Sequence, residues 1–166
     1  MATVLQLVRQ LTCRPTAPPV AGVRLRTFGQ AGDVERWLEL RHRAFARQRV
    51  GVRTWTEQDF AAEFLTKSWW LPERLWFAET AAPSGTPCTV GTVTLARRGD
   101  GAASRPVVHW LAVLPEWRRR GVARLLMAEL EAAAWDAGHC TLYLETHAGW
   151  TAAAKLYEEL GYRPAE

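Results

Sequence analysis

The sequence predicts one mixed α/β domain built around a single sheet. Three observations favour this fold class. The 166 residues are enough for one domain but short for two. Short apolar segments typical of strands are interspersed with longer segments whose apolar residues recur every three or four positions, as they do in helices. The composition, 48% hydrophobic and 23% charged, is that of a folded globular chain rather than a disordered or fibrous one.

The first 21 residues are expected to be an extension of this domain, which we place at residues 22–166. Apolar residues among the first eleven positions fit one face of a short helix, and Pro15, Pro18 and Pro19 prevent a regular element after them. We therefore predict a docking helix or a partly disordered tail over residues 1–21. Polar residues interrupt the apolar run, which resembles neither a secretory signal nor a membrane span, so we expect a cytoplasmic protein without a membrane partner.

The first half of the domain is predicted to be one strand followed by two helices. Residues 23–27 alternate apolar and polar side chains, as a half-buried strand does. Apolar residues at helical spacing follow Asp33 and continue to Phe45. Thr56 and Asp59 have the spacing of a capping box, which indicates the start of the second helix.

The second half is predicted to be three strands, a helix, a strand and a helix. A loop rich in Pro, Gly and Ser joins the first two strands, so we expect them to form an antiparallel hairpin. The third strand, residues 107–113, is almost wholly apolar and is expected to be buried on both faces. Gly121 and Gly138 mark the two ends of the long helix. The other elements are strands at 75–80, 90–97 and 141–145 and a helix from Thr151 to Gly161.

The positive charge of the chain is concentrated in one segment. The formal net charge is +4, yet residues 97–124 carry seven Arg against Asp100 and Glu116, a local net charge of +5. The rest of the chain is therefore slightly acidic. This pattern favours a local anion site over a generally basic surface, so nucleic acid is not the expected partner. The three cysteines are scattered and no His/Cys cluster occurs, so we expect neither a metal site nor a disulfide framework.

The segment from Leu111 to Arg124 has the pattern of a phosphate-binding strand, loop and helix. The strand ends near Val113, and a helix begins at Gly121 after three consecutive Arg residues. The first turn of a helix leaves backbone N–H groups without partners and carries a partial positive charge, which favours a bound phosphate. Neither the Lys of a P-loop nor the glycines of a dinucleotide-binding loop are present.

Two motifs resemble those of the GNAT superfamily of acyl-CoA-dependent N-acyltransferases. The run Arg-x-x-Gly-x-Ala at residues 118–123 matches the family's pyrophosphate loop, Arg/Gln-x-x-Gly-x-Gly/Ala. Residues 156–162, Leu-Tyr-Glu-Glu-Leu-Gly-Tyr, resemble its ending Leu-Tyr-x-x-x-Gly-Phe/Tyr. The resemblance covers residues 23–164. It implies a mixed central sheet with helices on both faces, whose central strands splay apart to admit the pantetheine arm of CoA.

The resemblance implies acetyl-CoA as cosubstrate, with no metal. The backbone at Leu111 and Val113 would bind the pantetheine amides, the amides of residues 119–124 would hold the pyrophosphate, and Arg118 would frame the loop. Many members carry an Asn that contacts CoA where this chain has Trp150, so that contact is lost or replaced. Thr151 beside it is either a CoA contact or only the N-cap of the last helix. The implied cofactor-binding residues are Leu111, Ala112, Val113, Arg118, Arg119, Arg120, Gly121, Val122, Ala123, Arg124 and Thr151.

Tyr157 and His109 are the candidates for catalysis. Tyr157 matches the family tyrosine near the thioester sulfur, where a phenol can give a proton or a hydrogen bond to the departing thiolate. The alternative for Tyr157 is a packing role in an amphipathic helix. His109 is the candidate base for the acceptor amine, and strand alternation predicts that it shares a face with Leu111 and Val113. The alternative for His109 is a hydrogen-bonded core histidine. Weaker candidates for the base are Glu79, Glu145 and His147.

The acceptor is expected to be a small-molecule or peptide amine. Trp55, Trp69, Trp70 and Trp76 either form an aromatic wall for an aryl or cationic amine, or pack the core or a homodimer interface. The sequence thus predicts an N-acetyltransferase that works by direct attack of the amine on acetyl-CoA in a ternary complex. The alternative is a non-catalytic acyl-CoA-binding or regulatory module on the same fold.

Overall fold

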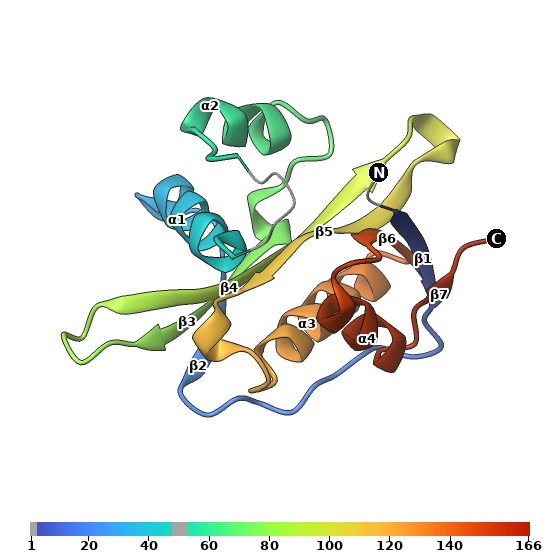
Figure 1. The fold of residues 1–166 in the computed structure, drawn as a ribbon. Helices are drawn as coiled ribbons and strands as arrows, with labels where there is room; N and C mark the ends of the chain where they lie inside the picture. The colour runs from blue at the N-terminus through green and yellow to red at the C-terminus, as the bar shows by residue number, and fades with distance from the viewer. Residues whose placement is uncertain (1–2, 48–52) are drawn as a thin grey trace.

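A seven-stranded mixed sheet forms the centre of the protein, with helices α1 and α2 on one face and α3 and α4 on the other (Figure 1). The computed structural model describes residues 3–47 and 53–166. No helix in these two ranges is long and apolar enough to cross a membrane. The strands are β1 (Val4–Gln10), β2 (Val23–Thr27), β3 (Leu75–Ala81), β4 (Pro87–Arg98), β5 (Arg105–Val113), β6 (Thr141–His147) and β7 (Arg163–Pro164). The helices are α1 (Asp33–Phe45), α2 (Glu57–Phe60), α3 (Val122–Asp136) and α4 (Thr151–Glu159), and a π-helical turn, η1 (Ala61–Leu65), continues α2.

The strands lie in the order β2-β3-β4-β5-β6-β1-β7. The predicted hairpin of β3 and β4 is antiparallel, and β4 also pairs antiparallel with β5. β5 and β6 are parallel neighbours at the centre of the sheet. The predicted mixed α/β architecture is confirmed, and each strand and helix expected after residue 22 is found, with ends that differ by a few residues.

The N-terminal segment is a strand, so the prediction of a docking helix or a tail is wrong for residues 4–10. β1 pairs antiparallel with β6 over all seven of its residues. Leu7 and, just after the strand, Leu11 are buried in the main core, against which Leu5 also packs. Arg9 lies between Leu7 and Leu11 in this alternating series and therefore also occupies an inward position. Because a charged residue occupies one of the inward positions, the period of two that indicates a strand is obscured in the sequence.

A buried ion pair explains the inward position of Arg9. Its Nη1 donates to Oε2 of Glu131 on α3 at 2.6 Å, and the hydroxyl of Tyr162 donates to Oε1 of the same carboxylate at 2.9 Å. Glu131 is only 1% exposed, and this burial raises the pKa of its carboxyl. The three side chains therefore join β1, α3 and the segment that follows α4.

A second buried carboxylate fixes the start of α1. Asp33 accepts hydrogen bonds from Arg26 of β2, at 2.8 and 2.9 Å, and from the backbone amides of Gly29 and Gln30. Burial by itself raises the pKa of Asp33, but these hydrogen bonds more than offset it and lower the pKa to about 2. The carboxylate is therefore ionised at neutral pH, and it anchors α1 to the edge of the sheet.

We expect Arg9→Ala to lower the free energy of unfolding by about 3 kcal/mol, because it leaves the buried Glu131 without its cation. Urea denaturation followed by tryptophan fluorescence measures this change. Arg14→Ala is the matched control, because it removes the exposed ion pair of Arg14 with Asp136 and should have a small effect. If the two substitutions destabilise equally, β1 is not tied to the core in the way described.

Candidate functional site

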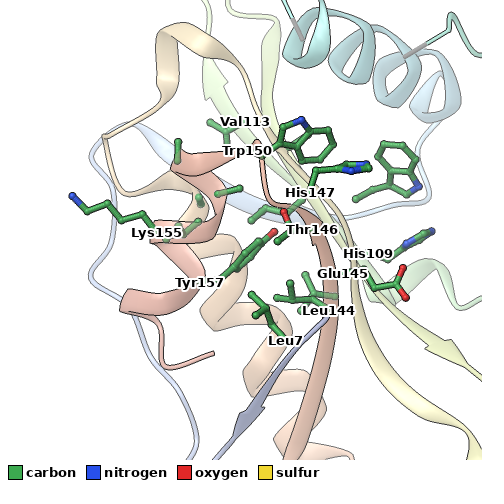
Figure 2. A pocket seen from close by; sticks show the side chains of 18 of the residues that line it. Leu7, His109, Val113, Leu144, Glu145, Thr146, His147, Trp150, Lys155 and Tyr157 are labelled. Carbon is green, nitrogen blue, oxygen red and sulfur yellow. The ribbon is translucent and has the colours of Figure 1, made fainter. Parts of the chain in front are cut away.

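The two central strands separate from one another and open a cavity. In the described chain, Val107 opposite Tyr143 is the single register pair between β5 and β6, and it lies near the start of both strands. A cavity of about 1000 Å³ lies along these strands, bordered by residues on both sides of this pair (Figure 2). Residues 109–111 are only half-buried because they border it, so the prediction of a strand buried on both faces is wrong at these positions. The predicted splay of the central strands is confirmed.

A bulge in β5 decides which side chains face which side of the sheet. Trp110 has a φ of 51°, and the pairing of β5 with β4 shifts register at this point. His109 and Trp110 both pack against the aromatic cluster beneath α1 and α2, whereas Leu111 and Val113 pack with the core that includes α3. The prediction that His109 shares a face with Leu111 and Val113 is therefore wrong, because the bulge interrupts the alternation of the strand.

The loop between β5 and α3 presents backbone amides at one end of the cavity. Arg119 and Gly121 both have left-handed backbone conformations, with φ of 62° and 87°. Gly121 is the N-cap of α3, and no side chain of the described residues caps this helix start. The helical ladder begins with the amide of Leu125 donating to the Gly121 carbonyl at 3.0 Å. The amides of residues 122–124 precede that bond and are available to an anion.

Arg118 holds this loop in place through two hydrogen bonds to backbone carbonyls. Its Nε donates to the carbonyl of Val113 at 3.1 Å, and its Nη2 donates to the carbonyl of Ala44 at 2.7 Å. One guanidinium thus joins the end of β5 to the last turn of α1. The neighbouring arginines are engaged differently: Arg120 lies over the ring of Trp117, and Arg124 pairs with Glu159 of α4.

The seven arginines of residues 97–124 divide between the two ends of β5. Four surround the loop, but Arg97, Arg98 and Arg105 lie at the opposite end of the strand, about 25 Å away for a strand of this length. There Arg98 pairs with Glu145 at 2.6 Å, and Arg105 lies over the ring of Tyr143 at 5.0 Å. The prediction that the charge surplus marks one local anion site is therefore wrong, because the length of β5 separates the two groups.

Tyr157 lies on α4 and borders the cavity. Its side chain is buried, and Figure 2 shows its hydroxyl directed toward β6 beside Thr146. The ring packs edge-on against Tyr162 with 5.8 Å between centroids. Burial raises the pKa of the Tyr157 phenol above its ordinary value, so the hydroxyl stays protonated at neutral pH and can donate a hydrogen bond into the cavity.

His109 borders the cavity from β5 and is held by a carboxylate that the sequence analysis did not single out. Its Nε2 lies 2.7 Å from Oε1 of Glu63 on η1. This hydrogen bond lowers the pKa of the Glu63 carboxyl, against the opposing effect of partial burial. The two residues are far apart in the chain and share no spacing motif, so no local pattern in the sequence connects them.

The weaker candidates for the base have different surroundings. Glu79 is buried on β3, bound to Arg26 at 2.6 Å and away from the cavity. Glu145 and His147 border the cavity, with Glu145 held by Arg98 and the His147 ring packed against Trp150 at 4.7 Å. His147 Nδ1 and Trp150 Nε1 are buried without a hydrogen-bond partner in the described chain, although both rings border the cavity.

The residues that the sequence analysis assigned to cofactor binding and catalysis all border this one cavity, except Arg120 and Val122. Thr151 is among them as the first residue of α4, and the N-cap of that helix is Trp150. The sequence analysis missed Val4, Gln6 and Leu7, because β1 was expected to be a helix or tail. Within residues 3–47 and 53–166, no three His, Cys, Asp or Glu side chains gather as a metal site would require.

The four tryptophans proposed as an aromatic wall pack the protein interior. Trp55, Trp69 and Trp70 surround the cluster centred on Trp37, and Trp76 is buried in the main core. This arrangement agrees with the core-packing alternative. The aromatic residues that do border the cavity, besides Tyr157, are Phe45, Trp110, Trp117, Tyr143 and Trp150.

Comparison with known proteins agrees with this geometry. The model of the acetyltransferase (GNAT) family matches residues 34–162. The chain belongs to the GNAT family. Two curated relatives are mycothiol acetyltransferases, one from Thermobispora bispora, 34% identical over 161 residues, and one from Nocardiopsis dassonvillei, 30% identical over 142 residues. These alignments cover 93% and 84% of this GNAT chain but only 51% and 42% of the relatives, so the chain spans about half the length of the curated relatives it matches.

Solved structures support the GNAT fold of this chain. A GCN5-related N-acetyltransferase from Sphaerobacter thermophilus superposes with a TM-score of 0.75 at 24% identity, over 98% of this chain and 48% of that one. An aminoglycoside N-acetyltransferase in complex with CoA superposes with a TM-score of 0.63 at 19% identity, over 91% of this chain and 94% of that one. The shared fold therefore extends over nearly the whole chain.

We expect the phenol of Tyr157 to remain protonated near pH 10, where an exposed tyrosine ionises, because burial disfavours its charged form. Absorbance at 295 nm, recorded during an alkaline titration of the wild type and of Tyr157→Phe, isolates this group. The two curves should coincide up to and through pH 10 while circular dichroism shows that the fold is intact. A titration step near pH 10 that Tyr157→Phe abolishes would contradict the buried placement.

Proposed function

We propose that this GNAT protein is an N-acetyltransferase that moves the acetyl group of acetyl-CoA to a small-molecule or peptide amine by direct attack in a ternary complex. One observation carries the proposal: a single cavity joins an uncapped helix start, an unpaired strand edge, and the side chains of Tyr157 and His109. The helix start suits the pyrophosphate of CoA, the strand edge suits its pantetheine arm, and the two side chains suit the thioester and the amine. The names of the curated relatives as acetyltransferases agree with the proposal.

The backbone would supply most of the cofactor contacts. The amides of residues 119–124 would hold the pyrophosphate, since they lie at the positive end of α3 with its N-cap open. The pantetheine arm would follow the edge of β5 at residues 111–113, whose N–H and C=O groups lack a strand partner on β6. Thr151 would complete the CoA site at the start of α4, beside the ring of Trp150, which stands where the family has Asn.

The chemical step forms a C–N bond and breaks the C–S bond of the thioester. The amine must be neutral to attack, and we assign removal of its proton to His109. The leaving thiolate would accept a hydrogen bond from the Tyr157 hydroxyl. A phenol is a weaker acid than a thiol, and burial raises the pKa of Tyr157 further, so stabilisation of the thiolate by the hydrogen bond should contribute more than complete proton transfer. Holding amine and thioester together would supply much of the acceleration.

Tyr157→Phe tests the proposed catalytic role. We expect kcat to fall about 100-fold, because the developing thiolate loses its donor, while the Kd for CoA stays within about twofold of the wild type. Acetyl-CoA turnover with a panel of amines, followed by thiol release, measures kcat, and calorimetry measures Kd. An unchanged kcat would contradict the assignment. Stabilisation of the wild type by CoA without turnover of any amine would favour the non-catalytic module instead.

Arg118→Ala tests the loop. We expect it to raise the Kd for CoA about tenfold, since the loop loses two hydrogen bonds from a charged group that hold it to Val113 and Ala44. Arg14→Ala, on the surface at the far end of α3, is the control and should leave the Kd unchanged. The same Kd for wild type and Arg118→Ala would show that this side chain does not frame the cofactor site.

A further inference from the structure

We propose that Glu63 is a positioning residue for His109: its carboxylate fixes the proton of the imidazole on Nε2, leaves the lone pair on Nδ1 for the acceptor amine, and stabilises the charge that forms on the ring. This inference rests on the proposed function, because it assumes an amine that must lose a proton. It assigns a catalytic contribution to a segment, η1, to which neither the sequence motifs nor the cofactor site gave a role.

The geometry of the pair restricts the ring of His109. Its Nε2 lies 2.7 Å from Oε1 of Glu63, and the His109 side chain is only 15% exposed. The rings of Phe64, Trp69 and Trp110 surround it, with centroids 5.7, 6.2 and 5.9 Å away. His109 borders the cavity but Glu63 does not, so the carboxylate supports the ring from outside the cavity.

The chemistry of the pair follows from its partners. A neutral imidazole has one N–H, and an ionised carboxylate can only accept, so the contact places that proton on Nε2. The hydrogen bond from His109 lowers the pKa of Glu63, so the carboxylate is ionised at neutral pH. When Nδ1 takes the proton of the attacking amine as the C–N bond forms, the positive charge that appears on the ring lies next to this carboxylate, which stabilises it.

Other charged groups near the ring do not replace Glu63. Lys67, just after η1, carries a positive charge that acts on the Glu63 carboxylate. From α1, the guanidinium of Arg41 lies over the rings of Trp55 and Trp110. From β6, Glu145 is bound to Arg98 at 2.6 Å. On β4, the residue opposite His109 is the uncharged Thr94. In the described chain, Glu63 is thus the carboxylate in hydrogen-bond contact with the imidazole.

The π-helical turn η1 presents two consecutive residues to His109. Glu63 and Phe64 are consecutive residues, yet both contact the His109 ring, one by a hydrogen bond and the other by packing. They lie in η1, where the helix changes from the α to the π form directly after α2. Single π-helical turns inside helices are rare and occur frequently at functional sites, so its position against His109 is consistent with the role of Glu63.

The pH dependence of kcat/KM for an amine that the wild type acetylates tests the role of Glu63. Glu63→Gln keeps an acceptor oxygen but removes the charge, so we expect the acid limb of the profile to move down by about one pH unit and the plateau to fall about tenfold. Glu57→Gln, the same change at an exposed position on α2, is the matched control and should alter neither. A uniform loss of activity with an unmoved acid limb would mean that Glu63 is merely structural, and would overturn the inference.

Nitrogen-15 NMR of the histidine rings gives a readout that needs no substrate. In the wild type, we expect the neutral His109 ring to be protonated on Nε2, and in Glu63→Gln to titrate at a lower pH. Protonation of the neutral ring mainly on Nδ1, or the same titration midpoint in both proteins, would overturn the inference. If the wild type acetylates no amine while the NMR results are as expected, the proposed function fails and the Glu63–His109 pair is still supported.

Discussion

The site depends on the early separation of β5 from β6. Two parallel strands that stayed paired would satisfy each other's backbone groups and leave no space between them. Here the register pair of Val107 with Tyr143 is followed by divergence, and the bulge at Trp110 changes the course of β5 within the same stretch. The cavity, the free edge at residues 111–113 and the exposed start of α3 all follow from this divergence. Tyr157 and His109 border the opening from different elements.

The neighbouring elements hold the separated strands in place. β1 pairs with all of β6, and the buried contact of Arg9 with Glu131 joins that pair to α3. On the other side, Arg118 joins the end of β5 to α1, whose start is anchored by Asp33. The opening is thus bordered by two packed units, each with its own buried ionic contact. This division allows a stable domain to keep a cavity of about 1000 Å³ at its centre.

The parts of the site that the sequence predicted are those with a local cause. The loop at residues 118–123 was predictable because a helix start directly after a strand and a short loop leaves backbone N–H groups that favour an anion. The helix that carries Tyr157 was likewise evident from apolar spacing and a terminal glycine. In both cases the residues that define the feature are close neighbours in the chain, so their spacing alone contains the information.

The parts that the sequence did not predict depend on contacts between distant residues. Arg9 interrupts the alternation of apolar residues that would have indicated strand β1. Its partner Glu131 lies on α3, far along the chain. The bulge that turns His109 to the face of α1 and α2 occurs at Trp110, a residue type that gives no sign of a left-handed backbone. The arginines at 97–124 form one cluster in the sequence, but in the fold they lie at the two opposite ends of β5.

Backbone hydrogen exchange with and without CoA tests the central claim, that the gap between β5 and β6 is the cofactor site. The account predicts that CoA slows exchange of the amides at residues 119–124, which would hold the pyrophosphate, and at residues 111–113, along the free edge of β5. Exchange at the arginine-bearing turn, residues 97–105, should not change. Protection confined to that turn, or none at residues 111–113 under saturating CoA, would contradict the account.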